Sequence, residues 1–301
     1  MCDAIRPGYD TQIQTSGTTI IQYTAVIIAY RQPQLLAAVL AGLADQTLPP
    51  RAVVVVDNGG TLTADVLASF PLAERTRLVP RPDNPGYAAA VNELSGTDAE
   101  ALLVLTHDAE FDDALAAELI GALESEPQAG AAAPVLRWVS NPDSIFSAGG
   151  YLTPGGRGGH LTAVRSNRPY AVDWVDGAIV MYRTTALDAI GWLSEDYFLY
   201  FEDVDTAWRM ARAGLSTLVV PTALARQQPG AHPLRLGIRN MTLFARRAGI
   251  NPVRQTLAVA RRVAEESASS ILRGRRPQPL QAWRGWREGL RGITGKPEYH
   301  G

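Results

Sequence analysis

The sequence predicts an α/β fold in which a mostly parallel, Rossmann-like sheet is flanked by helices. Short runs of consecutive apolar residues alternate with stretches of helical periodicity, and polar residues follow directly after several of the apolar runs. Strands that are apolar throughout are typical of a parallel sheet covered on both faces. The 301 residues, 46% of them hydrophobic, are enough to bury the core of one large domain.

The elements follow one another from Thr24 onward. The expected strands are 25–29, 53–56, 77–79, 101–105, 129–135 and one beginning near 218. The expected helices are 33–43, 62–69, 111–124 and one that starts near Val204 and is stopped by Gly214. Residues 141–168, rich in Gly, Pro and Ser, are expected to form loops, short hairpins and a mobile flap. Since ligands of such sheets bind beyond the carboxyl ends of the strands, we expect the site at that edge.

Two segments flank this domain, which we place at residues 23–250. Residues 1–22 show no periodicity and are expected to form a loose arm. Residues 251–301 predict two amphipathic helices, and ten basic residues of this tail face only four acidic ones. The tail is therefore either a solvated face or a peripheral contact with anionic lipid or a partner protein, and a homodimer is left open. The apolar stripes of the two helices are Leu257, Ala260 and Val263, and Leu280, Trp283, Trp286 and Leu290.

Composition limits the class of protein. A formal net charge of −2 argues against a general nucleic-acid binder, which needs a clear basic excess. The single cysteine, Cys2, leaves no internal disulfide and no cysteine zinc cluster. No apolar stretch is long enough to span a bilayer, and no apolar signal core follows a charged start. We therefore expect a cytoplasmic protein, with peripheral association at the inner face of the membrane as the alternative.

An aromatic run leads directly into two acids at the start of a predicted helix. Residues 197–201 contain four aromatic side chains and precede Glu202 and Asp203. Acids in a first helical turn offset the helix dipole and cap free amides, which is one explanation. A carboxylate beside apolar rings and open to a cleft can instead serve as a general base. Asp205 and Arg209 are spaced i, i+4 and predict a structural ion pair.

The residues around this helix resemble a known family. The run Val175-Asp-Gly-Ala-Ile-Val-Met-Tyr-Arg-Thr-Thr-Ala-Leu-Asp-Ala-Ile-Gly191, followed by Phe198-Leu-Tyr-Phe-Glu-Asp-Val-Asp205, is similar to the acceptor-side signature of family 2 glycosyltransferases. These are inverting sugar transferases of the GT-A fold, and the rhamnosyltransferase-like branch is the most similar. The resemblance covers roughly 24–249. It implies that Asp203, beside Glu202, removes the proton of the acceptor hydroxyl.

The resemblance also implies a nucleotide-binding pocket at the strand ends. Asp57 follows four valines and either shapes a simple turn or reads the ribose or base of a nucleotide. The segment from Asn84 through Gly86 to Asn92 is similar to one that lines this pocket in the family, where the glycine lets the backbone approach a ligand closely. The remaining donor-binding residues are Ala29 and Tyr30 at the end of the first strand, and Asp176 and Gly177 near the donor sugar.

A divalent cation, Mn²⁺ or Mg²⁺, is expected on the sugar diphosphate, because a hard cation offsets the charge of the leaving group. The resemblance makes Asp108 the metal ligand and the neighbouring His107 a donor contact, with Thr106 in place of the family's first acid. The sequence departs from the family at Gln227, where many members have a histidine ligand, and His232 is the alternative. In a metal-free site, arginines would balance the diphosphate instead. The nearby arginines are Arg226, Arg235 and Arg239, the last in an Arg-Asn pair expected at a helix start.

These residues predict the transfer of a sugar, with inversion, from a dTDP- or UDP-sugar to a hydroxyl of a glycan, a lipid-linked or a small-molecule acceptor. Asp57, Asp108 and Asp203 are expected to converge on one cleft. The alternative is a non-catalytic nucleotide-sugar-binding or regulatory protein, which the loss of the histidine favours and the intact acid pair opposes. A nucleotidyltransferase would want a phosphate-binding glycine near the first strand, and residues 29–33 contain none.

Overall fold

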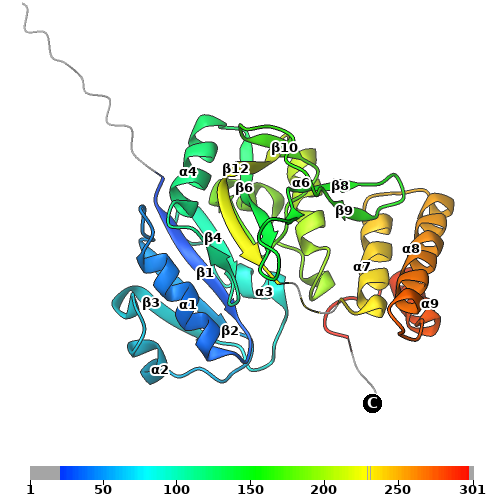
Figure 1. The fold of residues 1–301 in the computed structure, drawn as a ribbon, viewed down its shortest axis with the longest axis horizontal. Coiled ribbons are helices and arrows are strands. Elements are labelled where there is room, and N and C mark those ends of the chain that lie inside the picture. Colours follow the sequence, from blue (N-terminus) through cyan, green and yellow to red (C-terminus); the bar gives the residue numbers. More distant parts are fainter. Residues whose placement is uncertain (1–20, 229, 231, 298–301) are drawn as a thin grey trace, which may run out of the picture.

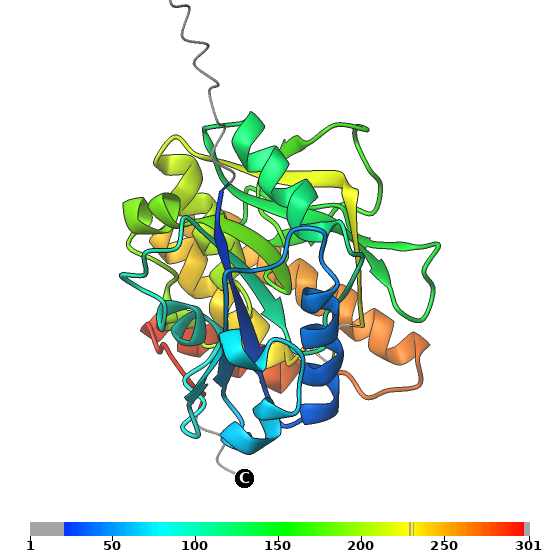
Figure 2. The ribbon, with the colours of Figure 1, turned by 90° about the vertical axis from the view of Figure 1, so that its left-hand side faces the viewer.

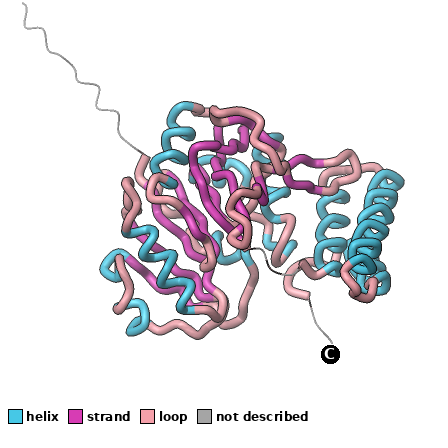
Figure 3. The backbone as a smooth tube through the Cα atoms, in the orientation of Figure 1, coloured by secondary structure: helices cyan, strands magenta, loops and turns pink. Residues whose placement is uncertain are grey.

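The computed structural model describes residues 21–228, 230 and 232–297. Apart from Ile21 and Gln22, the expected arm at 1–22 lies outside the described residues. Figures 1 and 3 show a sheet with helices packed on both faces and, at one end of the molecule, a layer of three further helices, α7, α8 and α9. Among the residues that the structure describes, no helix is long and apolar enough to cross a membrane.

The bounds of the elements follow the sequence prediction closely. The strands are β1 Tyr23–Ala29, β2 Ala52–Asp57, β3 Thr76–Pro80, β4 Ala101–Thr106, β5 Glu110–Phe111, β6 Ala129–Trp138, β7 Ile145–Ser147, β8 Gly150–Leu152, β9 Gly158–His160, β10 Tyr170–Val172, β11 Ile179–Arg183 and β12 Ser216–Gln227. The helices are α1 Pro33–Ala44, α2 Ala64–Ala68, α3 Tyr87–Asn92, α4 Leu115–Ser125, α5 Thr184–Ile190, α6 Glu202–Arg212, α7 Leu234–Arg247, α8 Pro252–Leu272 and α9 Pro279–Arg291.

The main sheet runs in the order β3-β2-β1-β4-β11-β6-β12-β10. The pairs β1 with β2, β1 with β4, β2 with β3 and β6 with β12 are parallel, whereas β11 is antiparallel to both of its neighbours. The predicted α/β class is confirmed, with a sheet that is mostly rather than wholly parallel. Strands β1, β2 and β4 end side by side at Ala29, Asp57 and Thr106, at the edge where the site is expected.

Strand β1 shows why the sequence runs are apolar throughout. Ala25 and Ile27 belong to the core cluster that contains α1 and α4, whereas Val26 and Ile28 belong to the cluster on the opposite face, which contains α3 and α5. Since successive strand residues point to opposite faces, a strand covered on both sides needs an apolar residue at every position. Figure 2 shows α1 (blue) running alongside β1.

Two helix starts differ from the sequence prediction. Helix α4 begins at Leu115 rather than at residue 111, because Glu110 and Phe111 pair with β12 as the short strand β5. Helix α7 begins at Leu234, so the Arg239-Asn240 pair lies in the middle of the helix and is buried.

The tail forms the two predicted helices, but the apolar stripes predicted for both are wrong. In α8, Leu257 is 65% exposed, and in α9 the buried residues are Ala282, Gly285 and Gly289. A Cβ added at Gly285 would lie 2.1 Å from the carbonyl oxygen of Arg235, so small residues let α9 pack directly on the backbone of α7. Three of the larger side chains that the pattern places inside are instead about half exposed: Leu280 56%, Trp283 49% and Leu290 46%.

Candidate active site

The loop that carries the aromatic run has an unusual backbone. Phe198, Tyr200 and Phe201 have φ values of 65°, 70° and 74°, in the left-handed region that residues with a Cβ rarely adopt. The side-chain amide of Asn240, in α7, lies 2.8 to 3.0 Å from three carbonyl oxygens within residues 197–200. The buried Arg-Asn pair therefore holds the loop in the conformation that leads into α6.

Gly86 lies against the same loop. A Cβ at this position would lie 2.3 Å from the carbonyl oxygen of Phe198, and the φ of Gly86 is +105°. The same carbonyl accepts a hydrogen bond from the Tyr87 backbone N–H at 2.9 Å. The close approach of the protein's own loop therefore requires a glycine at this position. As a result, segment 84–92 and the loop at 197–201 are packed together.

The two acids at the start of α6 lie in different environments. Glu202 is 5% exposed, and its Oε2 makes no hydrogen bond with any described residue. Burial, followed by the charge of Asp203, raises the pKa of Glu202 well above its ordinary value, because both disfavour the ionised carboxylate. Asp203 is only partly buried. Burial and, second, the Asp176 carboxylate raise the pKa of Asp203 to about 7, a value that suits a general base.

The residues implied as donor-sugar contacts lie next to this base. The Asp176 carboxylate accepts a hydrogen bond from the Ala178 backbone N–H at 2.9 Å. The carbonyl of Gly177 accepts a hydrogen bond from the hydroxyl of Tyr87, which is buried. Tyr87 lies inside the segment 84–92, but no sequence pattern predicts this contact.

Electrostatic interactions link the end of β4 to the start of α6. Burial raises the pKa of Asp176, the charge of His160 lowers it, and the carboxylate of Asp108 raises it again. Since Asp176 also acts on Asp203, the predicted metal ligand and the predicted base both lie within electrostatic range of the same carboxylate. Two of the three aspartates expected at one cleft are therefore close to a common group.

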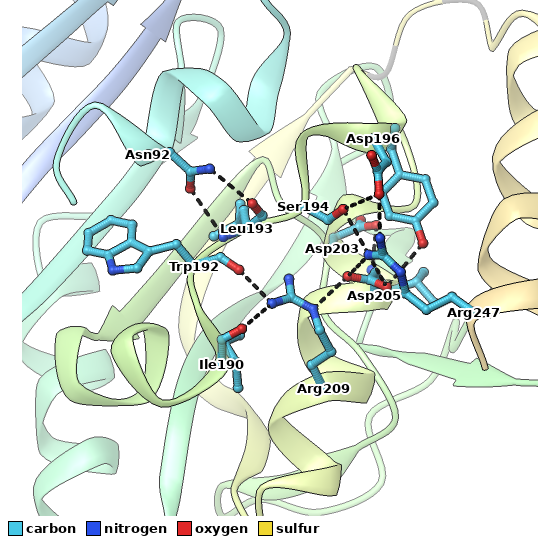
Figure 4. A network of polar contacts seen from close by, with 12 residues as sticks. Asn92, Ile190, Trp192, Leu193, Ser194, Asp196, Asp203, Asp205, Arg209 and Arg247 are labelled. Carbon is cyan, nitrogen blue, oxygen red and sulfur yellow. Dashed lines mark hydrogen bonds and ion pairs between the residues drawn. The ribbon is translucent and has the colours of Figure 1, made fainter. Parts of the chain in front are cut away.

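Figure 4 shows a polar network next to Asp203, centred on the buried Asp205. Its carboxylate accepts hydrogen bonds from Arg209 Nε at 2.7 Å, from Arg247 Nη1 at 3.2 Å and from the Tyr197 hydroxyl at 3.1 Å. The ion pair predicted between Asp205 and Arg209 is confirmed. Arg247, which the sequence analysis missed, adds a second cation from α7. Asp205 has no exposed surface, so this network supports the site rather than binding a ligand.

Asp57 shapes its own turn. It is fully buried, and its carboxylate accepts hydrogen bonds from three backbone N–H groups of residues 59–62 at 2.7 to 2.9 Å. This arrangement corresponds to the simple turn, in which the carboxylate binds its own backbone. The neighbouring Asn58 donates to the Gly86 carbonyl at 3.1 Å, while its buried Oδ1 makes no hydrogen bond with any described residue. The side-chain oxygen of Asn58 is thus a hydrogen-bond acceptor in this turn without a donor among the described residues.

Ala29, Tyr30 and His107 lie at the ends of neighbouring strands. Ala29 is buried, whereas Tyr30 is 40% exposed at the edge of the sheet. The Nδ1 of His107 lies 3.3 Å from the carbonyl oxygen of Ile28, so its ring has a partner within the protein. These positions surround the expected nucleotide pocket.

The two asparagines of the donor segment differ in their surroundings. Asn84 is partly buried and has a left-handed φ of 45°. Asn92 donates to the Leu193 carbonyl at 2.9 Å and accepts from the Leu193 backbone N–H at 3.1 Å, as Figure 4 shows. Asn92 therefore fixes the segment after α5.

The expected metal position contains oxygen donors. No three His, Cys, Asp or Glu side chains of the described residues lie close enough together to hold a metal ion. Because Arg226 pairs with Glu110, the register places Gln227 beside the turn that contains Asp108. Gln227 Oε1 and Thr106 Oγ1 are buried and make no hydrogen bond with any described residue. One carboxylate with neutral oxygens fits a hard cation that takes its remaining ligands from a diphosphate and water.

The structure places the alternative groups elsewhere. The ring of His232 stacks on Tyr200, with 3.5 Å between ring centroids, on the acceptor side of the loop. Arg235 pairs with Glu288 of α9, and Arg239 is 1% exposed and donates to the Tyr197 carbonyl. The expectation that Arg235 and Arg239 could balance a diphosphate is wrong, because both guanidinium groups are engaged inside the protein. Of the three arginines, Arg226 remains a candidate to balance the diphosphate, and its Nη1 lies 3.6 Å from Asp112 Oδ1.

Comparison with known proteins agrees with this geometry. Residues 22–244 match the family model described as glycosyltransferase like family 2. The chain is 30% identical to the N-acetylglucosaminyl-diphospho-decaprenol L-rhamnosyltransferase of Mycobacterium tuberculosis over 230 residues, which cover 66% of this chain and 73% of that protein.

Solved structures share the fold at low identity. GalNAc-T7 with UDP, GalNAc and Mn²⁺ has a TM-score of 0.61 and 12% identity, covering 75% of this chain and 48% of that chain. The mannosyltransferase PcManGT from Pyrobaculum calidifontis with GDP-Man and Mn²⁺ has a TM-score of 0.53 and 16% identity, covering 92% and 86%. The family match spans the loop at 197–201, both acids and Asp108. This chain therefore belongs to glycosyltransferase family 2 and is a glycosyltransferase of the GT-A fold.

Proposed function

We propose that this glycosyltransferase moves a sugar from a dTDP- or UDP-sugar to an acceptor hydroxyl with inversion, and that Asp203 is the general base. The observation that carries the proposal is the position of Asp203, partly exposed at the start of α6, with a pKa raised to about 7 beside Asp176. The mycobacterial relative is named as an L-rhamnosyltransferase that acts on a lipid-linked amino sugar diphosphate. Its similarity supports a deoxyhexose as the sugar and a lipid-linked sugar as the acceptor.

The proposed reaction is a single displacement. The Asp203 carboxylate takes the proton of the acceptor hydroxyl while the acceptor oxygen forms a bond to the anomeric carbon. The bond from that carbon to the diphosphate oxygen breaks, and its electron pair leaves with the nucleoside diphosphate. Attack from the side opposite the leaving group inverts the anomeric centre. Burial raises the pKa of the neighbouring Glu202, which disfavours a second negative charge next to the attacking oxygen.

The leaving group is expected to depart toward Asp108. Asp108, with the unused oxygens of Gln227 and Thr106, would hold a divalent cation together with the diphosphate. Such a cation would offset the negative charge that builds up on the diphosphate. We propose that Gly177 and Asp176 orient the sugar between Asp203 and the diphosphate.

Calorimetric titration of UDP and dTDP, with and without Mg²⁺ or Mn²⁺, tests the donor site. We expect one nucleotide to bind, with affinity raised at least tenfold by the metal in the wild type but not in Asp108→Ala. The exposed Asp143 provides a matched control, and Asp143→Ala should keep the metal effect. Nucleotide binding without any metal effect would contradict the role of Asp108. Binding with neither transfer to a lipid-linked acceptor nor donor hydrolysis would replace the proposal by the non-catalytic alternative.

A further inference from the structure

Exposed apolar side chains are concentrated in the tail. Thirteen large apolar side chains of the described residues are exposed, and eight of them lie between 253 and 293. Seven of them belong to α8 and α9 and one follows α9, and the family match ends at residue 244, before α8. The eight are Val253, Leu257, Ile271, Leu272, Leu280, Trp283, Leu290 and Ile293.

One face of α9 combines such side chains with arginines. We call it the α9 outer face and define it by Leu280, Trp283, Arg284, Arg287, Leu290 and Arg291, all exposed. At 3.6 residues per turn these six side chains fall within an arc of roughly 120°. The opposite side of the helix, with Gly285 and Gly289, packs on α7. Glu288 lies outside the arc and pairs with Arg235, so the outer face contains no acid.

An apolar groove continues this face toward α8. It has a volume of about 380 Å³ and lies between the two helices. Its lining includes Val259, Ala260 and Val263 of α8 and Ala282, Trp283 and Trp286 of α9. Trp283 belongs to both the groove and the outer face, and the Arg287 guanidinium lies 5.3 Å from the centroid of its ring. The apolar and cationic groups thus form one continuous surface.

The charge of this end of the molecule is opposite to that of the rest. Residues 252–297 carry ten basic and three acidic side chains, a net charge of +7, although the whole chain has a net charge of −2. Glu265 and Glu288, two of the three acids, are taken up in ion pairs. Arg284, Arg287 and Arg291 form no ion pair with any described acid. A second copy placed on this face would bring like charges together, which disfavours a dimer there.

We infer that the α9 outer face and its groove dock on the surface of an anionic lipid bilayer. Trp283, Leu280 and Leu290 enter the boundary between head groups and acyl chains, and the three arginines contact lipid phosphates. A helix with a cationic side, aromatic and aliphatic residues beside it and low overall hydrophobicity is the type that lies in the plane of a membrane surface. Helix α9 packs on α7, whose Asn240 holds the loop before Asp203, so docking would fix the acceptor side of the site relative to the bilayer.

Sedimentation of the full-length protein with vesicles tests this inference. Vesicles of phosphatidylcholine alone are compared with vesicles that contain 30% phosphatidylglycerol, at low and high salt. We expect binding to the anionic vesicles only, weakened at least tenfold by Arg284→Gln, Arg287→Gln and Arg291→Gln combined. Leu280→Gln, Trp283→Gln and Leu290→Gln combined should weaken binding similarly and abolish the blue shift of tryptophan fluorescence. The matched control, Arg77→Gln, Arg165→Gln and Arg168→Gln, removes three exposed arginines outside the tail and should bind as the wild type does.

The inference is overturned if the wild type does not sediment with the anionic vesicles, or if the control triple weakens binding as much as the α9 triple. It is also overturned if the wild type does not bind vesicles and light scattering shows instead a dimer that is dissociated by the triple variant containing Trp283→Gln. Thermal unfolding checks that each variant is folded. Vesicle binding requires no sugar transfer, so the proposed reaction can fail while this inference stands, and the reverse.

Discussion

The substitution Asp203→Asn is expected to reduce transfer and, at the same time, to stabilise the protein at alkaline pH. Burial and Asp176 hold the pKa of Asp203 at about 7, against 3.8 for the ordinary carboxyl. Between about pH 4 and pH 7 the unfolded chain has lost this proton while the folded protein keeps it, so the stability of the wild type falls as the pH rises. Asparagine has a similar shape and does not titrate.

The magnitude follows from the shift. While only the folded state holds the proton, each pH unit changes the free energy of unfolding by about 1.4 kcal/mol, and the range from pH 5 to the pKa of about 7 covers two such units. Relative to Asp203→Asn, the free energy of unfolding of the wild type should therefore fall by about 3 kcal/mol between pH 5 and pH 8. Removal of the base should lower the initial rate of transfer by roughly 100- to 10,000-fold. The wild-type rate should rise with pH through about 7, because only the ionised carboxylate accepts a proton.

Urea unfolding of both proteins at four pH values between 5 and 8 measures the first quantity, and initial rates at saturating donor measure the second. Asp98→Asn removes an exposed carboxylate and should show the pH dependence of the wild type. If Asp203→Asn and the wild type lose stability in parallel as the pH rises, the carboxyl of Asp203 is not raised in pKa. If the variant transfers sugar at the wild-type rate, Asp203 is not the base.

Three further substitutions test how the site is held. Gly86→Ala places a Cβ 2.3 Å from the Phe198 carbonyl oxygen and should lower the free energy of unfolding in urea by more than about 3 kcal/mol. The control Gly96→Ala, at a glycine with a similar φ and open space around it, should lower it by only about 1 kcal/mol. Equal losses would show that the positive φ, and not the contact with Phe198, sets the cost. Asn240→Ala removes one hydrogen-bond donor from each of three carbonyl oxygens, although Arg239 still donates to that of Tyr197. It should lower the free energy of unfolding by about 2–4 kcal/mol and should also lower kcat, so an unchanged kcat would show that the loop keeps its shape without Asn240. Asp205→Asn leaves Arg209 and Arg247 without a buried counter-charge and should lower stability by about 3–5 kcal/mol in thermal or urea unfolding, and a loss under 1 kcal/mol would mean that solvent replaces the carboxylate.

The sheet and the position of the site could be predicted because they depend on patterns that neighbouring residues share. Apolar runs fixed the strands, and the carboxyl ends of β1, β2 and β4 then placed the polar residues on one edge. The ion pair of Asp205 and Arg209 follows from helical spacing alone. These features depend on local sequence patterns and not on contacts with residues that are distant in the sequence.

Other features depend on distant partners and could not be predicted in this way. A turn sequence such as Asp57-Asn58-Gly59 is the same whether its carboxylate binds a nucleotide or its own backbone, and only the fold decides between them. The side of α9 that is buried is set by how closely Gly285 can approach the backbone of Arg235, so the largest apolar residues remain outside. Similarly, the sequence pattern alone leaves Arg239 without a partner, but in the structure it lies buried in the middle of α7, next to the loop at 197–201.

Loops that face an acceptor are natural units to exchange between related transferases when a new specificity is wanted. In this chain residues 197–201 are not such a unit, because their backbone lies against Gly86 and is held by Asn240. A loop grafted without both positions would meet a Cβ on one side and lack its amide on the other. Exchange between relatives should therefore transfer the loop together with the segments that contain Gly86 and Asn240. Among natural relatives that differ in acceptor, residues 198–200 should change together with these two positions.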